Sequence, residues 1–481
     1  MAAGQGTRMK SATPKVLHEI AGIPILGHVL ATAHSLAASK VLAVLRHEKE
    51  LIENYVNSHF PRTEIVTQDE IPGTGRAVEQ ALSALGEFSG DVLILSGDVP
   101  LLDVESISQL IQSHQNAQAE GSLISVVLEN PNGYGRILRG AGAAVSGEIK
   151  GGVAWVNQEL GPLKGIVEQK DATAQELEID EVNAGVYVFD AQGLREHLAQ
   201  VGMQNAQGEK YLTDVVGLML QAGKKVQAQQ ILDPYLVAGV NDRAQLSELA
   251  AELNARIVRA WQLAGVTIQE PHSTWIDVTV QLGEDVTLLP STRLHGLTRI
   301  GVGSVVGPDT TLRDVEVGEG AKISRTQADS AKVLDGASVG PFAYLRPGTE
   351  LGPDGKIGAF VETKNAKIAR GAKVPHLSYV GDASIGEGAN IGAGTIFANY
   401  DGVNKHRTEI GAHARTGSGN VFVAPVTIGA GAYTAAGSTI RRNVEPGALA
   451  LNPGPQKNMA GWVLEQRPGS ASAKAASEIT E

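Results

Sequence analysis

The sequence predicts an α/β domain followed by a parallel β-helix built from hexapeptide repeats. Short apolar strands alternate with helical patterns over about the first 230 residues, which indicates an α/β sheet with crossover connections. Farther along, an aliphatic residue recurs at every sixth position. Glycine is abundant, at 57 of 481 residues, whereas only 4% of the residues are aromatic. A narrow β-helix has many turns and little room for large side chains, so the composition agrees with the repeat.

The composition also limits what the protein can do. A chain of 481 residues is too long for one ordinary domain, so two or three domains are expected. The absence of cysteine excludes a disulfide framework, a thiolate metal site and a cysteine nucleophile, and it favours a reducing compartment. No apolar run is long enough to span a bilayer, and a net charge of −12 disfavours nucleic acid and anionic membranes as partners. We therefore expect a cytoplasmic protein with small-molecule ligands, without nucleic-acid binding or membrane insertion.

Four short segments indicate the fold of the first domain, and a longer one follows it. Strands are expected at Val41–Leu45, Val92–Leu95 and Leu123–Leu128, each apolar with polar residues or glycine at its ends. A helix is expected over Gly75–Leu85. Beyond this domain, Arg243–Leu263 contains neither glycine nor proline and places apolar residues on one helical face, which predicts a connecting helix that lies on a neighbouring domain.

The second half of the chain repeats with a period of six. Its first run has aliphatic residues at Ile276, Leu282, Leu288, Leu294, Ile300, Val306 and Leu312. Neither a helical period of 3.6 nor strand alternation explains this spacing, whereas a coil of three short strands, each with one inward aliphatic residue, does. Residues 276–447 contain 27 of the glycines, often directly after the aliphatic residue, where the chain must turn. Residues 399–407 are out of register and are predicted to form a loop that could carry ligand chemistry.

These patterns divide the chain into four segments. We assign residues 1–235 to the α/β domain, 236–265 to a linker that contains the connecting helix, 266–455 to the β-helix and 456–481 to a C-terminal tail. From Arg467 onward the tail is rich in serine, alanine and charged residues, and its end is expected to be disordered.

The chain begins with a glycine-rich segment that could bind a polyphosphate. It reads Ala2-Ala3-Gly4-Gln5-Gly6-Thr7-Arg8-Met9, and Pro14-Lys15 follows. Glycine leaves backbone N–H groups open to a phosphate, and Arg8 and Lys15 supply positive charge. The segment lacks the Gly-Lys-Ser/Thr end of a P-loop and the third glycine of the dinucleotide fingerprint. Taken alone, such a Gly-x-Gly is as readily a turn as a binding site.

With the β-helix behind it, this segment resembles a known family. Gly4-x-Gly6-Thr7-Arg8-Met9 with Pro14-Lys15 is similar to the signature of sugar-1-phosphate nucleotidyltransferases, and the hexapeptide domain resembles a left-handed β-helix acyltransferase. In this order the two resemble the bacterial bifunctional N-acetylglucosamine-1-phosphate uridyltransferases / glucosamine-1-phosphate N-acetyltransferases, from Ala2 to about Trp462.

The resemblance implies a fold, an assembly and a pair of reactions. The fold is an α/β nucleotidyltransferase (Rossmann-like) domain followed by a left-handed parallel β-helix of hexapeptide repeats, assembled as a homotrimer. The first reaction transfers acetyl from acetyl-CoA to glucosamine-1-phosphate. The second transfers uridylyl from UTP to N-acetylglucosamine-1-phosphate with Mg²⁺ and releases pyrophosphate.

In the first domain the resemblance implies a nucleotide-sugar site. Matching positions would bind the nucleotide and its phosphates (Ala2, Ala3, Gly4, Arg8, Lys15), read the uracil (Gln68, Gly73, Thr74), follow the strand end (Ser96, Gly97, Asp98) and contact the sugar and ribose (Gly135, Glu168, Asn183). Asp98 and Asn241 match the family's magnesium ligands, and oxygen donors suit this ion. An acidic residue directly after a strand is also where ligands bind in open α/β sheets. Without the resemblance, Asp98 would be a turn or helix cap as readily.

On the β-helix the resemblance implies an acetyltransferase site. His376 matches the general base that takes a proton from the glucosamine amine, a role that imidazole can perform near neutral pH. Other matching positions hold the sugar phosphate and sugar (Arg346, Lys364, Tyr379, Asn390) or line the acetyl-CoA path (Ala393, Asn399, Tyr400, Ser418, Ala436), some across subunits of the trimer. By itself a lone histidine is more often structural or exposed, and both alanines equally suit a β-helix corner. Trp462 would close this site from a neighbouring subunit or lie exposed.

Two positions depart from the family's pattern. The family has a hydrophobic strand before the glycine-rich segment, where this chain has Met1. Loss of a central strand would cost several kcal/mol of a typical margin of ~5–15 kcal/mol, so a mis-assigned start is the expected explanation. A real loss would be expected to impair uridylyl transfer but not acetyl transfer. Some members also have an arginine near the CoA phosphates where this chain has Pro453, which predicts a different grip on the coenzyme.

Two other readings of the sequence remain open. One is a single-function sugar-1-phosphate nucleotidyltransferase whose β-helix serves only assembly. The other is a non-catalytic β-helix scaffold subunit. The His376 motif and the length of the repeat argue against the first. The second is disfavoured by the presence of the matching site residues Asp98, Asn241, Lys15, His376, Lys364 and Asn399.

Overall fold

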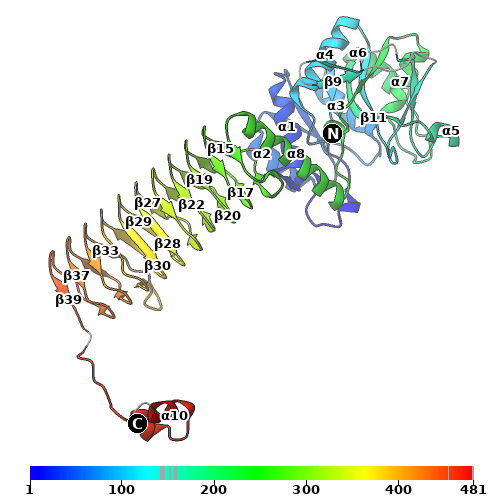
Figure 1. Cartoon of the computed structure of the whole chain (residues 1–481). Coiled ribbons are helices and arrows are strands. Elements are labelled where there is room, and N and C mark those ends of the chain that lie inside the picture. Colours follow the sequence, from blue (N-terminus) through cyan, green and yellow to red (C-terminus); the bar gives the residue numbers. More distant parts are fainter. Residues whose placement is uncertain (141–146, 151–152, 157–159, 453, 479–481) are drawn as a thin grey trace. The chain divides into compact units, whose positions relative to one another are not determined.

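A computed structural model describes residues 1–140, 147–150, 153–156, 160–452 and 454–478. The chain divides into two compact units, Met1–Ala260 with Trp275–Thr279 and Trp261–Thr274 with Val280–Glu481. Figure 1 shows the first as intermingled helices and strands and the second as a stack of short strands. Among the described residues, no helix is both long and apolar enough to cross a membrane.

Unit 1 alternates strands and helices. Its helices are η1 (Thr7–Met9), η2 (Lys15–Leu17), α1 (Ile25–Ser35), α2 (Lys49–His59), α3 (Thr74–Leu85), α4 (Val104–Ala117), α5 (Ala174–Leu177), α6 (Ala191–Leu198), α7 (Thr213–Gln221), η3 (Pro234–Val237) and α8 (Arg243–Leu263), which continues into unit 2. Its strands are β1 (Glu19–Ile20), β2 (Ile23–Pro24), β3 (Val41–Leu45), β4 (Thr63–Thr67), β5 (Asp91–Ile94), β6 (Gly121–Val127), β7 (Arg136–Arg139), β8 (Gly147–Lys150), β9 (Val153–Val156), β10 (Leu163–Val167), β11 (Glu181–Asp190), β12 (Val226–Ile231) and β14 (Trp275–Ile276).

The predicted strands and helices are present, but the sheet is mixed. β3 and α8 have their predicted bounds, and β5, β6 and α3 lie within two residues of theirs. The main sheet has the order β10-β7-β11-β6-β12-β9-β8, with β5 also on β11. β11 pairs antiparallel with β5, β6 and β7, while β6 and β12 are parallel. β3 and β4 form a separate parallel pair.

Helices cover both faces of the main sheet. Neighbouring residues of β6 face opposite ways: Leu123 packs in one apolar cluster with Val215 of α7, and Ile124 in another with Leu110 of α4. A strand buried on both faces reads as a continuous apolar run, which is why β6 was recognisable in the sequence.

An apolar cavity lies between β3 and β5. At its end Met1 and Ala2 occupy the space between the two strands: the Ala2 N–H donates to the Val44 carbonyl (2.8 Å), and the Met1 ammonium donates to the Leu95 carbonyl (2.7 Å). The rest of the space is a cavity of about 330 Å³ lined by β3, β5, α1 and α3.

We expect three apolar β-forming residues added directly before Met1, such as Val-Ile-Val, to stabilise unit 1. Each side chain buried in the cavity contributes about 1.5–3 kcal/mol. At ~2–4 °C per kcal/mol for a domain of this size, the three side chains together should raise the Tm by roughly 10–35 °C in calorimetry. The added peptide bond also removes the Met1 ammonium, whose pKa burial lowers from 8.0 to about 6.

The pH dependence of stability gives this prediction a second readout. Because the amino group of Met1 has a lower pKa in the folded state, the unfolded chain binds more protons between about pH 6 and 8, and the free energy of unfolding rises with pH in that window. The extended variant should lose this rise. A Gly-Ser-Gly extension removes the same charge without filling apolar space, so an equal Tm for the two extensions would contradict a role for the cavity.

Unit 2 is a solenoid of short strands. They are β13 (Thr267–Ile268), β15 (Gln281–Leu282), β16 (Thr287–Leu288), β17 (Thr292–His295), β18 (Arg299–Ile300), β19 (Val305–Val306), β20 (Thr310–Arg313), β21 (Glu316–Val317), β22 (Lys322–Ile323), β23 (Thr326–Asp329), β24 (Lys332–Val333), β25 (Ser338–Val339), β26 (Ala343–Leu345), β27 (Glu350–Leu351), β28 (Lys356–Ala359), β29 (Glu362–Ile368), β30 (Lys373–His376), β31 (Tyr379–Ile385), β32 (Ile396–Ala398), β33 (Thr408–Ile410), β34 (Arg415–Thr416), β35 (Val421–Val423), β36 (Val426–Ile428), β37 (Tyr433–Thr434), β38 (Thr439–Ile440) and β39 (Leu449–Ala450). A 3₁₀ turn, η4, spans Pro271–Ser273.

The coils stack through parallel pairing, as the period of six predicted. Leu288 pairs with Val306 of the next coil, and Val306 pairs with Ile323 of the one after. These aliphatic side chains are buried in the solenoid. The predicted β-helix is therefore confirmed.

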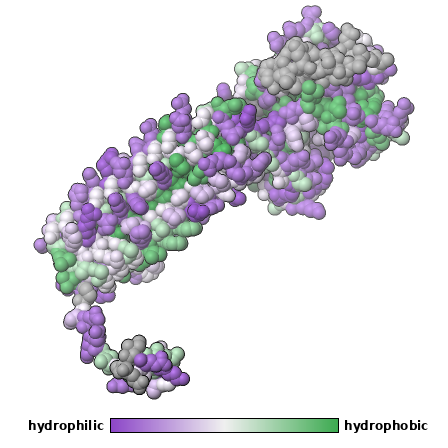
Figure 2. All heavy atoms as spheres, in the orientation of Figure 1, coloured by the Kyte–Doolittle hydropathy of each residue, from purple (hydrophilic) through white to green (hydrophobic). Residues whose placement is uncertain are grey.

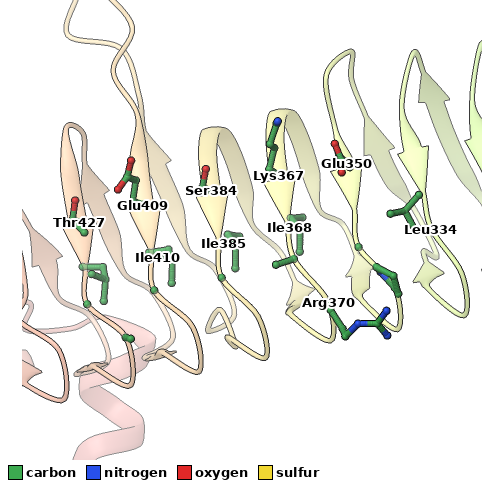
Figure 3. Close-up of a pocket in the computed structure, with 18 residues that line it drawn as sticks. Leu334, Glu350, Lys367, Ile368, Arg370, Ser384, Ile385, Glu409, Ile410 and Thr427 are labelled. Atoms are coloured by element: carbon green, nitrogen blue, oxygen red, sulfur yellow. The ribbon is translucent and has the colours of Figure 1, made fainter.

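Charged residues line one outer face of the solenoid in alternating sign. Strand register places Arg299, Glu316, Lys332, Glu350 and Lys367 beside one another in successive coils. The Lys332 Nζ lies 2.8 Å from a Glu316 carboxylate oxygen. Figure 2 shows hydrophilic residues interspersed with neutral and hydrophobic ones along the visible face of this unit, and Figure 3 shows Glu350 and Lys367 on the side of the ribbon opposite the isoleucines.

The C-terminal tail differs from its expectation of disorder. It contains two helices, α9 (Trp462–Gln466) and α10 (Ala471–Glu478). The Ala473 N–H donates to the Ser470 hydroxyl at the start of α10 (3.1 Å), and the following residues are mostly good helix formers. A serine cap before an alanine-rich run therefore outweighs the low apolar content. Pro453 lies outside the described residues.

Candidate active sites

The glycine-rich segment leads from the sheet into η1. Ala2 is buried between β3 and β5, whereas Gly4 and Arg8 are exposed and Ala3 is half-buried. Gly6 has φ +63°, and a Cβ there would lie 2.6 Å from the Cβ of Lys15. Glycine is thus required for Lys15 to pack against this turn.

A polar cluster forms around Asp98 at the end of β5. The Lys15 Nζ lies 2.5 Å from the Asp98 Oδ2, and the Asp98 carbonyl accepts from the Val240 N–H (2.9 Å). A Cβ on Gly239 would lie 3.9 Å from both the Asp98 Cγ and the Asn241 Nδ2. The structure therefore brings the two predicted metal-binding residues, Asp98 and Asn241, to the same place.

Ser96 and Gly97 connect this cluster to neighbouring strands. The Ser96 hydroxyl donates to the Gly185 carbonyl of β11 (3.4 Å). A Cβ on Gly97 would lie 2.7 Å from the Met1 carbonyl oxygen, so only glycine allows the N-terminal residues to lie this close. Ser96 and Gly97 therefore fix the position of the backbone that leads from β5 to Asp98.

Tyr134 is a member of the cluster that sequence reasoning missed. Burial raises the pKa of its phenol, whose oxygen meets the backbone of Gly239 and lies in the field of Asp98 and Arg8. The signal was present in Gly133-Tyr134-Gly135-Arg136, where only Gly135 was singled out.

Gln68 organises the loop after β4. Its side chain is only 5% exposed, and its Nε2 donates to the carbonyls of Ile71 (2.9 Å) and Gly73 (3.2 Å). Because both partners are acceptors, they fix the amide orientation and leave Oε1 as the acceptor for a ligand.

Gly73 and Thr74 lie against the segment that precedes α7. A Cβ on Gly73, whose φ is +118°, would overlap the backbone of Lys210. The Thr74 hydroxyl oxygen accepts from the Leu212 N–H (3.1 Å). The predicted uracil-reading residues thus form one loop, residues 68–75, held by residues 210–212.

Gly135, Glu168 and Asn183 also meet. The Asn183 N–H donates to the Gly135 carbonyl (2.9 Å), and a Cβ on Gly135 would lie 3.5 Å from the Glu168 Oε1. The Asn183 Nδ2 donates to the Tyr187 phenol (2.6 Å). Burial raises the pKa of Glu168, and nearby carboxylates add to this shift. A carboxylate and an amide at one place can bind vicinal hydroxyl groups.

In unit 2 three cationic side chains converge. Arg346 follows β26, Lys364 lies in β29, and Lys405 comes from the loop of residues 399–407. The pKa of Lys364 is lowered, mainly by direct contact with the Lys405 ammonium and further by Arg346. Sequence reasoning singled out the loop but not Lys405. Such a cluster favours an anion that offsets its charge, such as a phosphate.

Asn399 anchors the loop next to these cations. It is 7% exposed, and its Nδ2 donates to the Asp382 carboxylate (2.5 Å). A Cβ on Gly381 would lie 2.6 Å from the Asn399 Nδ2 and 2.7 Å from the Tyr379 ring, so glycine is required where these side chains meet. Tyr400 is exposed on the loop. Asn399 therefore acts here as a tether of the loop.

His376 lies exposed at the end of β30, beside a column of β-helix corners. Backbone hydrogen bonds join the corners of successive coils: Gly394 N–H to His376 O (3.2 Å), Gly419 N–H to Ala393 O (2.7 Å) and Gly437 N–H to Ser418 O (2.8 Å). Ala393, Ser418 and Ala436, which are far apart in sequence, thus lie along one column next to the histidine.

Asn390 and a surface hollow lie apart from these contacts. The backbone of Asn390 bridges Lys373 and Arg415 in the neighbouring coils. The hollow, of about 590 Å³, includes Glu350, Lys367 and other residues of the charged face (Figure 3). None of the predicted site residues lines it, so we do not assign it to the acetyltransferase site.

Together the two units define a class of protein. Unit 1 places cations and a carboxylate at strand ends of an α/β sheet, as in nucleotidyltransferases, and unit 2 places a histidine and three cations on a hexapeptide β-helix, as in acyltransferases. The class is that of two-site transferases with one site in each unit.

Comparisons with known proteins identify the family. Residues 1–170 match the family model of the MobA-like NTP transferase domain. The chain is 54% identical to the Bifunctional protein GlmU of Clavibacter sepedonicus, over 100% of this chain and 94% of that protein. It is 55% identical to the protein of this name from Leifsonia xyli (99% and 94%) and 51% identical to that from Mycobacterium bovis (100% and 94%). The chain belongs to the GlmU family.

This membership confirms the predicted fold class and the predicted enzyme, a uridyltransferase and acetyltransferase of UDP-N-acetylglucosamine synthesis. A non-catalytic scaffold or a single-function nucleotidyltransferase does not fit a family of bifunctional proteins. A crystal structure of apo UDP-glucose pyrophosphorylase is 17% identical over 53% of this chain and 97% of that chain, with a TM-score of 0.38, which is too low to support an inference.

Proposed function

We propose that this protein makes UDP-N-acetylglucosamine in two steps at two separate sites, one in each unit. Unit 2 transfers acetyl from acetyl-CoA to glucosamine-1-phosphate, and unit 1 couples the product to the uridylyl group of UTP. The observation that carries this proposal is a charged cluster in each unit, Lys15 beside Asp98 in unit 1 and Lys364 beside Lys405 in unit 2. The protein acts in the cytoplasm as a homotrimer.

The uridylyl step needs positioning more than covalent chemistry. A phosphate oxygen of N-acetylglucosamine-1-phosphate attacks the α-phosphorus of UTP, the bond to the bridging oxygen breaks, and pyrophosphate leaves. Arg8 and Lys15 offset the charge on the phosphates, while the exposed backbone at Gly4 approaches them closely. Glu168 and Asn183 bind sugar and ribose hydroxyls.

The residues around Asp98 fit a magnesium ion. A carboxylate and an amide oxygen are donors that Mg²⁺ prefers, and Asp98 and Asn241 lie together at Gly239. With only two protein ligands, the ion would be held largely by phosphates and water. When bound, the ion neutralises charge on the triphosphate.

Gln68 gives selectivity for uracil to the loop of residues 68–75, which we call the base loop. With its amide hydrogens used by Ile71 and Gly73, the Oε1 accepts the N3–H of uracil. Cytosine carries an acceptor at this position, so the same oxygen disfavours CTP.

In the acetyl step His376 acts as the general base. The glucosamine amine attacks the thioester carbonyl of acetyl-CoA, His376 accepts the amine proton, and the C–S bond breaks to release coenzyme A as a thiolate that then takes up a proton. Arg346 and Lys364 hold the sugar phosphate, and Tyr379 and Asn390 contact the sugar. The coenzyme lies along the column of Ala393, Ser418 and Ala436, near Asn399 and Tyr400. Since the chain has no cysteine, acetyl passes directly to the amine.

A two-stage assay tests the proposed function. The purified chain is given glucosamine-1-phosphate and acetyl-CoA, and then UTP with Mg²⁺, and each product is measured separately. We expect coenzyme A in the first stage and pyrophosphate in the second. Failure to acetylate, or failure to use separately supplied N-acetylglucosamine-1-phosphate with UTP, would refute the corresponding half of the proposal.

Replacing Lys405 with methionine should weaken binding of the sugar phosphate. Loss of a charge-assisted contact in this cluster should raise the KM for glucosamine-1-phosphate about 10-fold, with a smaller effect on kcat. Steady-state kinetics at varied glucosamine-1-phosphate measures this effect. Lys367→Met is the matched control, since it removes the same charge from the charged outer face. Equal KM values for the two variants would show that Lys405 does not bind the substrate.

A further inference from the structure

Residues 210–213, which we call the clasp, connect the base loop to Glu168, the carboxylate predicted to bind the sugar. The clasp makes four hydrogen bonds to the region of the loop: Lys210 N–H to Pro72 O (3.1 Å), Gly75 N–H to Lys210 O (2.8 Å), Leu212 N–H to the Thr74 hydroxyl (3.1 Å) and Lys210 Nζ to the Glu79 carboxylate (2.9 Å). The base loop and the clasp therefore form one hydrogen-bonded body.

The last residue of the clasp contacts the predicted sugar site. Thr213, the first residue of α7, is 4% exposed, and its hydroxyl donates to the Glu168 Oε1 (2.9 Å). Leu212 and Thr213 are thus adjacent residues that contact, respectively, the residue expected to read the uracil and the residue expected to bind the sugar. These contacts fix the distance between Thr74, expected to read the uracil, and Glu168, expected to bind the sugar.

Glu168 needs such a contact because its surroundings are unfavourable for a carboxylate. It is half-buried, and Asp171, Glu209 and Asp214 act on it electrostatically. The Thr213 hydroxyl opposes these effects and stabilises the ionised form. An ionised carboxylate accepts hydrogen bonds from sugar hydroxyls, whereas a protonated one loses acceptor capacity.

We propose that Thr213 is a positioning residue of the uridyltransferase site, whose hydroxyl holds the Glu168 carboxylate toward the sugar hydroxyls at a distance from the base loop that the clasp sets. This inference rests on the proposed uridylyl transfer in unit 1. It assigns to α7 a part in substrate selection without direct contact with the reacting atoms.

Thr213→Val tests the inference because valine keeps the shape of the side chain and removes only its hydroxyl. We expect the KM for N-acetylglucosamine-1-phosphate to rise about 10- to 100-fold, as for loss of one hydrogen bond to a charged group. The KM for UTP and the acetyltransferase rate should stay within twofold of wild type. Thr213→Ser, which retains the donor, should restore most of the sugar affinity.

The pH profile separates positioning from a merely structural role. Without the hydroxyl the pKa of Glu168 rises further, so the loss of sugar affinity on acidification should begin at a higher pH than in wild type. Thr63→Val is the matched control: it removes another buried hydroxyl of unit 1, which contacts His34 (2.8 Å), and should leave the profile unchanged.

The outcomes distinguish this inference from the proposed function. Wild-type protein without uridylyl transfer would refute the proposed function itself. An active wild type whose Thr213→Val variant has an unchanged KM for N-acetylglucosamine-1-phosphate would overturn the positioning role, as would equal changes in both KM values. If Thr213→Val does not fold, the Thr213→Ser and Thr213→Ala variants are compared instead. Equal KM values for N-acetylglucosamine-1-phosphate in these two variants would also overturn the positioning role.

Discussion

His376→Ala is expected to lower acetyl transfer by about 10²- to 10⁴-fold, the range typical of a lost general base. His376 is exposed at the end of β30, so its truncation opens no cavity in the β-helix. The backbone hydrogen bond from the Gly394 N–H to the His376 carbonyl does not need the imidazole. The defect should therefore lie in kcat, because the phosphate-binding cations remain.

The same protein preparation supplies the internal control. Uridylyl transfer by His376→Ala should equal that of wild type, since unit 1 carries its own site. His272→Ala removes another exposed histidine of unit 2 and should leave both activities unchanged. Acetyl transfer at the wild-type rate in His376→Ala would show that another group takes the amine proton.

The β-helix was predictable because its inward positions tolerate few residue types. Leu288 and Val306 each fill the narrow interior of one coil, so the period of six had to appear in the sequence. Helix α8 was equally predictable, because a long run without glycine or proline that places its apolar residues on one face favours a helix over other secondary structures. The tail was different: low apolar content predicted disorder, but a serine cap and good helix formers are sufficient for α10.

The site residues that the sequence did not reveal act through contacts between distant segments. Lys405 contacts Lys364 from a loop that Asn399 tethers to Asp382. Tyr134 contacts the backbone of Gly239 near Asp98, and although it stands next to Gly135 in the sequence, this contact with a distant segment is defined only by the fold. A motif identifies residues that touch substrate, whereas the residues that place them are defined by the folded chain.

Asp98→Asn is expected to lower uridylyl transfer by about 10²- to 10³-fold, equivalent to several kcal/mol of lost charge stabilisation. The substitution keeps the shape of the side chain and removes its charge. Two interactions weaken together: the ion pair with Lys15 at 2.5 Å and the carboxylate that would hold Mg²⁺ beside Asn241. Raising the Mg²⁺ concentration should recover part of the activity, because the amide oxygen remains a weak ligand.

Binding of Mn²⁺ in the presence of UTP, followed by electron paramagnetic resonance, measures the metal site without turnover. We expect the affinity for Mn²⁺ to fall at least 10-fold in Asp98→Asn and acetyl transfer to be unchanged. Asp91→Asn, at the opposite end of β5, is the matched control and should bind Mn²⁺ as wild type does. If Asp98→Asn lost uridylyl transfer but bound Mn²⁺ normally, the carboxylate would act through Lys15 alone. The ion would then be held by Asn241 and the phosphates, and the assignment of Asp98 as its ligand would be wrong.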